Sequence, residues 1–450
     1  MAVFRRRLLF WLFKAYLKKR GKVIALSFLL GLAIFFLLVT TSPFLARLIP
    51  SEKKVTVGVV GAFSVHNLPS FIVGKISQGL TTVDRNGQIK PAVAAAWQTE
   101  DNGKRFVFKL KDDLRFHDGS KVTSKSIGYD FKDVSIERPD DKTIVFTLKD
   151  AYTPFLVTVS RPIFKKGSVG IGEYHIDDIE LNGNFVKYLR IKSVKSIFRS
   201  EDYLFYPSEE ALKVAFALGE VSQAVGLGDT TFHQSSFEKY QNVMIEKNVA
   251  YDRLVTLFYN TKDSVLSDKK VRNALTYALP DIFSEGQRSQ TPYAPTSIFF
   301  NTDLPEKKQN RTRATELLAD LQKETAVVKL TIKTQKKYRK TAETIAKSWK
   351  TIGIATTIEE VDTLPPQYQV YLSDFSVPKD PDQYVLWHST HVNNITFIDN
   401  QRIDKLLEDG RKTTDTNKRQ EIYFDFQKYL LDESPASFLY FPYEFSVKRT

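Results

Sequence analysis

The sequence feature that most constrains this chain is an uncharged stretch near its N-terminus. Residues 23–46 carry no charged side chain, and residues 23–39 are almost entirely apolar. An α-helix needs about 20 consecutive apolar residues to cross the hydrocarbon core of a bilayer. The sequence therefore predicts a transmembrane anchor over residues 23–46, followed by a large part outside the membrane.

The positive charge of the chain is concentrated beside this stretch. Residues 1–54 hold eleven Lys or Arg and one acidic residue, so they carry +10 of the net charge of +13 and leave +3 for the remaining 396 residues. Because basic residues beside a membrane helix favour the cytoplasmic side, we expect residues 1–22 to be a cytoplasmic basic segment and the rest to be extracytoplasmic. A nucleic-acid-binding protein would need its basic patch on the folded part, so we expect no nucleic-acid partner.

A cleaved signal peptide is the alternative interpretation of the apolar stretch. Such a peptide has an apolar core of about 7–15 residues and small residues before its cleavage site. Here the core is longer, and Phe44 interrupts the small-residue pattern that ends at Ala46. A site ending at Ser42 would be followed by Pro43. The pattern favours an uncleaved, single-pass anchor in the cell membrane.

Composition sets the size and excludes one kind of chemistry. The chain has 450 residues, 42% of them hydrophobic and 13% aromatic, which is enough for two or three domains. It has no cysteine, so disulfides and thiolate metal sites are excluded. His66 and His117 have no partners at the spacing of metal ligands. We therefore expect no metal site and no cofactor.

Residues 91–123 predict a strand between two tight turns. Phe106, Phe108 and Leu110 recur at the period of two that is typical of a β-strand. Residues 101–103 (Asp-Asn-Gly) precede the strand and residues 117–120 (His-Asp-Gly-Ser) follow it. Both are turn sequences, because Asn and Gly tolerate a left-handed backbone. Taken alone, this pattern indicates only a surface hairpin.

The exact order of residues in this segment is more informative than its alternation, because it resembles the signature of the family 5 extracytoplasmic solute-binding proteins. This family includes the oligopeptide- and dipeptide-binding components of ABC importers. The matching positions are Pro91, Ala94, Trp97, Gly103, Lys104, Phe106, Phe108, Leu110, Leu114, Phe116, His117, Asp118, Gly119, Val122 and Thr123. Other motifs of the family match in order between residues 55 and 443, including a glycine-rich turn at 167–174 and a closing strand at 433–442.

The resemblance implies a fold and its domain boundaries. The fold would be α/β: a two-lobed, periplasmic-binding-protein-like clamshell (type II, class C-like, three subdomains) after one N-terminal transmembrane helix. Lobe 1 (domain I) would comprise residues 52–70, 165–260 and 432–450, and lobe 2 (domain III) residues 261–431. Residues 71–164 would form a reduced domain II, because the helical insert of larger relatives is missing. The strand–helix–Gly–strand pattern of residues 329–360 independently predicts a doubly wound third domain.

The resemblance also implies a ligand site in residues 368–388. In relatives that bind peptides, an Asp after a strand of this region holds the α-ammonium of the peptide, ahead of an acidic-Pro pair. Asp374 matches best and Asp380 is the second candidate, although the spacing between Asp374 and Asp380-Pro381 is three residues longer than in the family. A strand-ending role for Asp374 is the alternative. The other predicted ligand-binding residues are Phe375, Trp387, Phe63, Ser64 and His66, of which the last three lie in a loop resembling the family's first ligand-side loop and the aromatic ones could equally be core residues.

The function implied is that of a membrane-anchored extracellular receptor, acting as a monomer, that closes around a peptide and delivers it to an ABC permease. A nickel chelate or an oligosaccharide is an alternative ligand, and a peptide sensor without transport is an alternative role on the same fold. An exported hydrolase would need a nucleophile–base pair or a metal cluster. The sequence has no Gly-x-Ser-x-Gly, no His-Glu-x-x-His and no cysteine, so we expect no enzyme activity.

Overall fold

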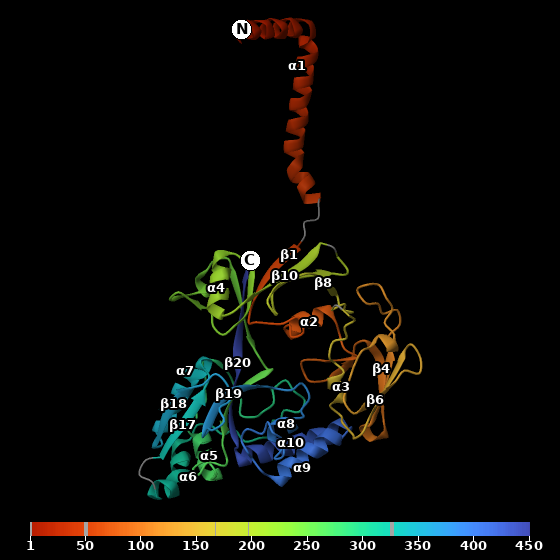
Figure 1. Ribbon diagram of the computed structural model, residues 1–450. Helices are drawn as coiled ribbons and strands as arrows, with labels where there is room; N and C mark the ends of the chain where they lie inside the picture. Colours follow the sequence, from red (N-terminus) through yellow and green to blue (C-terminus); the bar gives the residue numbers. More distant parts are fainter. Residues whose placement is uncertain (1, 49–52, 167, 197, 325–327) are drawn as a thin grey trace. The chain divides into compact units, whose positions relative to one another are not determined.

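The computed structural model describes residues 2–48, 53–166, 168–196, 198–324 and 328–450, so the boundary predicted at residue 52 lies outside the described residues. The chain divides into two compact units, Met1–Lys54 with Ile197–Arg199, and Val55–Ser196 with Ser200–Thr450. The first unit is dominated by one long helix, and the second is a mixed α/β body (Figure 1).

Helix α1 (Ala2–Leu48) contains the predicted anchor. Its segment Lys14–Thr41 is long and apolar enough to cross a membrane, and it begins nine residues before the predicted start at residue 23. The hydroxyls of Thr40 and Thr41 donate to the carbonyl oxygens of Phe36 (2.8 Å) and Leu37 (2.6 Å). These polar atoms are thus satisfied within the helix, as a hydrocarbon solvent requires.

Twelve of the described strands form one mixed sheet in the second unit. Their order is β18-β17-β19-β15-β20-β11-β1-β10-β9-β8, with β14 and β16 also paired to β20. The bounds are β1 (Lys53–Val60), β8 (Tyr174–Asn182), β9 (Phe185–Ser193), β10 (Arg199–Tyr206), β11 (Gln223–Leu227), β14 (Val243–Val249), β15 (Arg253–Tyr259), β16 (Gly286–Arg288), β17 (Val328–Thr334), β18 (Ile354–Glu360), β19 (Val370–Ser376) and β20 (Ala436–Arg449).

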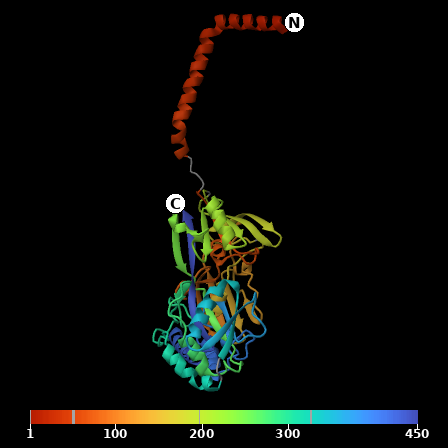
Figure 2. The same ribbon diagram turned by 90° about the vertical axis from the view of Figure 1, so that its left-hand side faces the viewer.

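Strand β20 belongs to both halves of this sheet. Its residues 436–440 pair with β15, and its residues 443–449 pair with β14. Strands β14 and β15 follow one another in the chain, so β20 and the β14–β15 connection run side by side where the halves meet. Figures 1 and 2 both show β20 between the C-terminus and the region of α9 and α10.

The half of the sheet that contains β17–β19 has the predicted crossover. Strands β17 and β18 are parallel and are joined by α7 (Arg339–Lys350), whose Ile345 and Trp349 are fully buried. Gly353 adopts a φ of +83° between the helix and β18, which explains the glycine at this turn. The predicted strand–helix–Gly–strand unit is confirmed. The other helices of residues 261–431 are α5 (Lys269–Tyr277), α6 (Arg311–Glu324), α8 (Tyr384–Trp387), α9 (Gln401–Lys412) and α10 (Thr416–Glu433).

Residues 94–148 form a separate four-stranded sheet in the order β4-β5-β7-β6. The predicted strand is β5, and the predicted Asp101-Asn102-Gly103 turn joins it to β4, with all three residues at positive φ. Phe106 and Phe108 point into an aromatic core. The remaining bounds in residues 70–240 are α2 (Ser70–Ile76), β2 (Thr81–Val83), β3 (Ile89–Pro91), β4 (Ala94–Glu100), β5 (Arg105–Leu110), β6 (Val134–Glu137), β7 (Thr143–Leu148), α3 (Phe155–Thr158), α4 (Glu209–Leu218), β12 (Thr231–Phe232) and β13 (Ser235–Ser236).

The glycine-rich turn packs against the end of α2. A Cβ atom on Gly172 would clash with the carbonyl oxygen of Lys75, and one on Gly170 would clash with that of Ile76. His117 fixes the same turn, because its Nε2 donates to Gly172 O (3.0 Å) and its Nδ1 accepts from Gly170 N (3.3 Å). The described residues therefore give His117 a structural role.

Candidate ligand-binding site

A cavity of about 720 Å³, here called the cleft cavity, lies just after the C-terminal end of β19. Its walls come from four separated segments of the chain: residues 83–87, 247–252, 293–297 and 377–381. The first segment falls in the predicted domain II, the second covers the end of β14 and the β14–β15 connection, and the last two fall in the predicted domain III. Ligands of open α/β sheets bind beyond the carboxyl ends of strands, which is where this cavity lies.

The cleft cavity carries charges of both signs. Its cationic side chains are those of Arg85, Lys247 and Lys379, and its carboxylates are those of Asp84 and Asp252. Lys90 binds the Asp84 carboxylate at 2.7 Å, and the hydrogen bond from Lys90 lowers the pKa of Asp84. No hydrogen bond or ion pair joins the Asp252 carboxylate to a described residue, and Asp252 is exposed. Its main-chain oxygen accepts from Val377 N (2.8 Å), which holds Asp252 beside the end of β19.

Asp374 lies on β19, opposite Val255 of β15, and is 16% exposed. The Nζ of Lys337 is 3.0 Å from its Oδ1, and Tyr338 also donates to it. Burial acts to raise the pKa of Asp374, but the hydrogen bond and charge of Lys337 outweigh this and the pKa is lowered. Asp374 therefore already binds an ammonium group from its own chain.

The segment that follows β19 reaches the cleft cavity only beyond Asp374. The wall formed by the segment after β19 begins at Val377, three residues beyond Asp374. Counted back from Asp380-Pro381 at the shorter family spacing, the position expected for the Asp is also residue 377. The longer spacing thus leaves Asp374 on the strand and places an apolar residue at the cavity.

Asp380 is buried and forms a bidentate ion pair with Arg419 of α10. Nη2 of Arg419 is 2.6 Å from Oδ1, and Nη1 is 3.0 Å from Oδ2. The Nε of Arg419 donates to Gly410 O at 2.8 Å. Because both carboxylate oxygens are engaged, the contacts of Asp380 indicate a structural role.

The neighbouring Asp382 belongs to a junction between the predicted domains II and III. Burial raises its pKa, and Nε of Arg411 lies 3.0 Å from its Oδ2. The Arg411 guanidinium lies over the rings of Tyr384 (4.2 Å) and Tyr152 (5.1 Å). Thr153 N donates to Arg411 O at 2.8 Å. Residues far apart in sequence thus hold the two predicted domains together.

The remaining predicted site residues fall into two groups. Phe375 and Trp387 contact one another edge to face (6.5 Å between ring centroids) and lie in the core cluster around Phe258. Trp387 is 1% exposed. Phe63 packs on Phe205 in a different core cluster, beside the half-buried Ser64 and the exposed His66. The structure thus brings Phe375 and Trp387 together, and it places Phe63, Ser64 and His66 in a different part of the fold.

The residues that sequence reasoning missed are those of the cavity wall, above all Asp252, Arg85 and Lys379. Two of them stand in turns between strands, since Arg85 lies in the β2–β3 turn and Asp252 between β14 and β15. A polar turn residue is ordinary in a sequence, so only the spatial meeting of these turns identifies them. The Pro378-Lys379-Asp380-Pro381 run after β19 was the available signal for Lys379.

Comparisons with known proteins identify the family of this chain and its fold. The sequence model of the family described as bacterial extracellular solute-binding proteins, family 5 Middle, matches residues 88–397, more than half of the chain. The oligopeptide-binding protein AppA of Bacillus subtilis (strain 168) is 24% identical over 459 residues, which cover 84% of this chain and 83% of that protein.

Solved structures show the same fold. The ABC transporter substrate-binding protein CtaP from Listeria monocytogenes superposes with a TM-score of 0.75 at 20% identity, covering 89% of this chain and 94% of CtaP. NikZ from Campylobacter jejuni, solved in complex with Ni(L-His), gives a TM-score of 0.73 at 18% identity, covering 89% and 94%. The predicted α/β, periplasmic-binding-protein-like fold class is confirmed. The chain belongs to the bacterial extracellular solute-binding proteins of family 5.

Proposed function

We propose that this protein captures short peptides outside the membrane and delivers them, as a monomer, to the permease subunits of an ABC transporter. The observation that carries the proposal is the cleft cavity, which has charges of both signs and walls from four separated segments. A free peptide is a zwitterion with an ammonium at one end and a carboxylate at the other. Arg85 and Lys379 supply cations for the carboxylate, and an Asp supplies the partner for the ammonium.

Two carboxylates compete for the role of ammonium partner. Family resemblance assigns it to Asp374, whose Lys337 partner is half exposed on a flexible stem and would have to leave. The cavity wall assigns it to Asp252, which needs no partner displaced. Both assignments require burial of a carboxylate against an ammonium, and such a charge-assisted bond is strong in a desolvated cleft.

Isothermal titration of the full chain in phosphatidylcholine nanodiscs tests the proposal. The ligands are mixtures of free di- to pentapeptides and the same peptides with acetylated N-termini, and native mass spectrometry identifies any ligand that survives purification. We expect the free peptides to bind and the acetylated ones to bind at least about tenfold more weakly. If no free peptide binds, the proposal is wrong.

Substitutions then separate the two carboxylates. If Asp252 holds the ammonium, Asp252→Asn should weaken the binding of free peptides. If Asp374 holds it, Asp374→Ala should weaken this binding without unfolding the chain. Asp303→Asn is the control, because Asp303 is exposed and does not line the cleft cavity. Unchanged affinity in one of the first two variants removes that residue from the role.

A nickel chelate is the second candidate ligand, because NikZ was solved with Ni(L-His). Within the described residues no three His, Cys, Asp or Glu side chains are grouped to hold a metal ion. The chelator would therefore have to supply the metal ligands. A titration with nickel and L-histidine under the same conditions decides between the ligands, since binding of the chelate without binding of peptides would favour the second candidate.

We also propose that α1 remains as a single-pass anchor with a cytoplasmic N-terminus. The support is the uncharged part of α1 that begins at residue 23, within the span Lys14–Thr41, with the Lys and Arg residues of 1–22 immediately before it. The intact mass of the protein purified from bacterial membranes tests this. A chain that retains its first residues supports the anchor, and a chain that begins after residue 42 or 46 identifies a cleaved signal sequence.

A further inference from the structure

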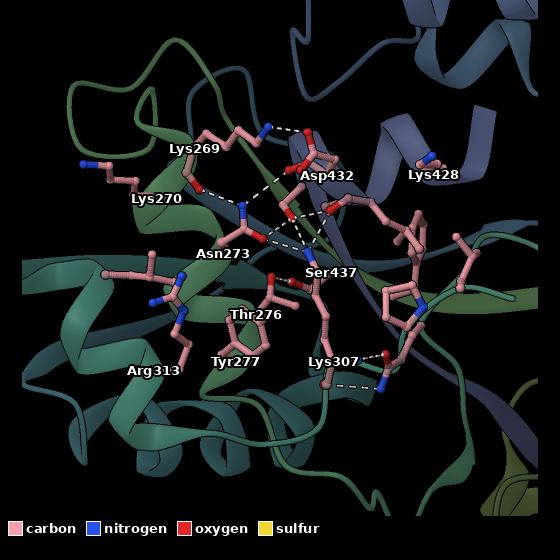
Figure 3. Close-up of a pocket in the computed structure, with 18 of the residues that line it drawn as sticks. Lys269, Lys270, Asn273, Thr276, Tyr277, Lys307, Arg313, Lys428, Asp432 and Ser437 are labelled. Carbon is pink, nitrogen blue, oxygen red and sulfur yellow. Dashed lines mark hydrogen bonds and ion pairs between the residues drawn. The ribbon is translucent and has the colours of Figure 1, made fainter. Parts of the chain in front are cut away.

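A second cavity, of about 490 Å³, is lined mainly by the predicted domain III, with residues 432–438 of the predicted lobe 1, and shares no lining residue with the cleft cavity. Its walls come from α5, α6, α10, the 304–307 segment and the first residues of β20 (Figure 3). We call it the basic cavity. Its cationic side chains are those of Lys269, Lys270, Arg288, Lys307, Arg313 and Lys428.

The charge of the basic cavity is strongly one-sided, with six cationic side chains and one carboxylate in its walls. The carboxylate, Asp432, is engaged by Lys269 at 2.5 Å. Arg313 has a partner on its own helix, Glu316, at 3.1 Å. Lys428 forms no ion pair with a described residue. The walls therefore hold more positive charge than their own acids neutralise.

Lys307 is a cation of the basic cavity whose hydrogen-bond partners are all uncharged. Its Nζ donates to Asn273 Oδ1 (2.7 Å), Leu431 O (2.8 Å) and Ser434 Oγ (3.1 Å), as the dashed lines of Figure 3 show in part. Burial lowers its pKa to about 8, with Asp432 opposing this effect and Lys269 adding to it. Capping of the C-terminal end of α10 explains the contacts to Leu431 and Ser434, but none of the three acceptors of Lys307 carries a negative charge.

The side chain of Arg288 has a hydrogen-bond donor that no described residue accepts. Its Nη1 donates to the main-chain oxygens of Phe438 and Leu439 (2.9 Å to the latter), whereas its buried Nε has no acceptor within the part of the chain that the structure describes. Arg288 also lines an adjoining cavity of about 610 Å³, with Gln290, Leu304, Pro305 and Leu431 in both walls. A buried donor without an acceptor is costly, so a ligand acceptor at this place would be favourable.

Apolar side chains form much of the remaining wall. They are those of Tyr277, Leu304, Pro305, Leu317, Leu431 and Phe438. A simple inorganic anion would leave these walls unfilled, and a neutral apolar molecule would leave the cations without a partner. The volume falls within the range of about 300–1,000 Å³ that is common for small-molecule sites.

We propose that the basic cavity binds an amphipathic monoanion, an organic acid with its carboxylate on an apolar chain or ring. The carboxylate lies toward Lys307 and Arg288, and the apolar part lies between α6 and the 304–305 segment. This site is independent of the cleft cavity and of the proposed peptide ligand, because the two cavities share no residue.

The test is isothermal titration of octanoate into the full chain in phosphatidylcholine nanodiscs, with acetate, octan-1-ol and inorganic phosphate as comparison probes. Empty nanodiscs are titrated in parallel and their heat is subtracted. We expect saturable binding of octanoate, and binding of each other probe at least about tenfold weaker. Absence of octanoate binding, or equal binding of phosphate, overturns the proposal.

Three variants locate the bound octanoate. Lys428→Glu reverses a charge at the wall, and Leu304→Trp fills the cavity without changing its charge, so both should weaken octanoate binding at least about tenfold. Lys418→Glu is the matched control, because it makes the same charge change on α10 at an exposed position outside the cavity. Octanoate affinity that is unchanged by Leu304→Trp would place the ligand elsewhere and overturn the assignment. Peptide titrations of the same variants should be unaffected, whatever their result in the wild type.

Discussion

At the scale of single residues, the acidic side chains that sequence motifs point to are already engaged by other parts of the chain. Asp374 binds Lys337, and Asp380 binds Arg419. A buried carboxylate with a cationic partner contributes to the folded state only while the pair is intact. Their roles are therefore separable by measuring stability and ligand binding on the same variants.

The Asp380–Arg419 pair should be essential for stability. Arg419→Met leaves the Asp380 carboxylate buried without its partner, which typically costs about 3–5 kcal/mol. We expect the urea midpoint, followed by pulse proteolysis of the full chain, to fall accordingly. The double variant Asp380→Leu/Arg419→Met should recover most of the lost urea midpoint, because it buries no unpaired carboxylate. A midpoint unchanged by Arg419→Met alone would contradict the buried pair.

The Asp374–Lys337 pair should give a stability that depends on pH. The pKa of Asp374 is lowered in the folded chain, so its contribution is present above the pKa of the unfolded chain, about 3.9, and is lost as pH falls through the folded value. Lys337→Met removes the main partner and should lower the melting temperature at pH 7. The difference from wild type should shrink as the pH approaches 3.

Lys336→Met is the control for this measurement, because Lys336 is the exposed neighbour and lies in no ion pair with a described residue. A melting difference for Lys337→Met that is the same at pH 7 and pH 3 would show that the carboxylate does not mediate the effect.

These residues also show what the sequence could not supply. The motif around Asp380 was found, but its partner Arg419 lies 39 positions further along the chain, and nothing local joins them. The aromatic character of Trp387 was equally compatible with a ligand wall and with the core, and its full burial places it in the core. The ion-pair partner and the burial of a side chain both depend on how distant elements pack, and a periodic sequence pattern does not predict that packing.

At the scale of elements, local patterns were reliable where the physical signal is local. Strand β5 alternates with period two, and α7 is followed by a glycine at positive φ. The closing strand is the exception, because its motif ended at residue 442 whereas β20 continues to Arg449. The added residues pair with β14 and β11, so their extended form depends on partners far away in sequence.

The glycine-rich turn gives an element-scale prediction. Gly172→Ala places a methyl group against the carbonyl oxygen of Lys75 and should destabilise the contact between this turn and α2 (Ser70–Ile76). Gly74→Ala in α2 itself meets no atom within 4 Å and should stabilise the helix by up to about 1 kcal/mol. Thermal unfolding of the two single variants should therefore shift in opposite directions. Equal shifts would contradict the close packing of the turn.

At the scale of the whole α/β body, the cleft cavity lies beside one of the two antiparallel connections between the half-sheets. The chain passes between the halves at the β14–β15 connection and along β20, and these segments are hydrogen-bonded to one another, as in Ala250 N to Pro442 O at 2.9 Å. Paired strands of this kind can bend together when lobes close around a ligand. The predicted domains II and III are joined on the far side by main-chain hydrogen bonds that such a movement must break.

Two amides report this movement directly. Thr153 N donates to Arg411 O (2.8 Å) and Ile298 N donates to Asn86 O (3.3 Å), and both bonds join residues 71–164 to residues 261–431. If opening exposes the cleft, these amides exchange with solvent hydrogen through the open form, and a ligand that binds the closed form must slow them. At a peptide concentration of 100 times Kd the closed form gains about 2.7 kcal/mol, so exchange should slow by up to about a hundredfold.

The control is Trp387 N, whose bond to Gln383 O lies within α8 and the residue before it and does not cross between domains. Its exchange should change little when peptide is added, because the predicted domain III would keep its own packing. Protection of Thr153 and Ile298 without protection of Trp387 would identify closure as a movement of the predicted domain III against the predicted domain II. Unchanged exchange at Thr153 and Ile298 under saturating peptide would show that these domains move as one body and that ligand entry uses another opening.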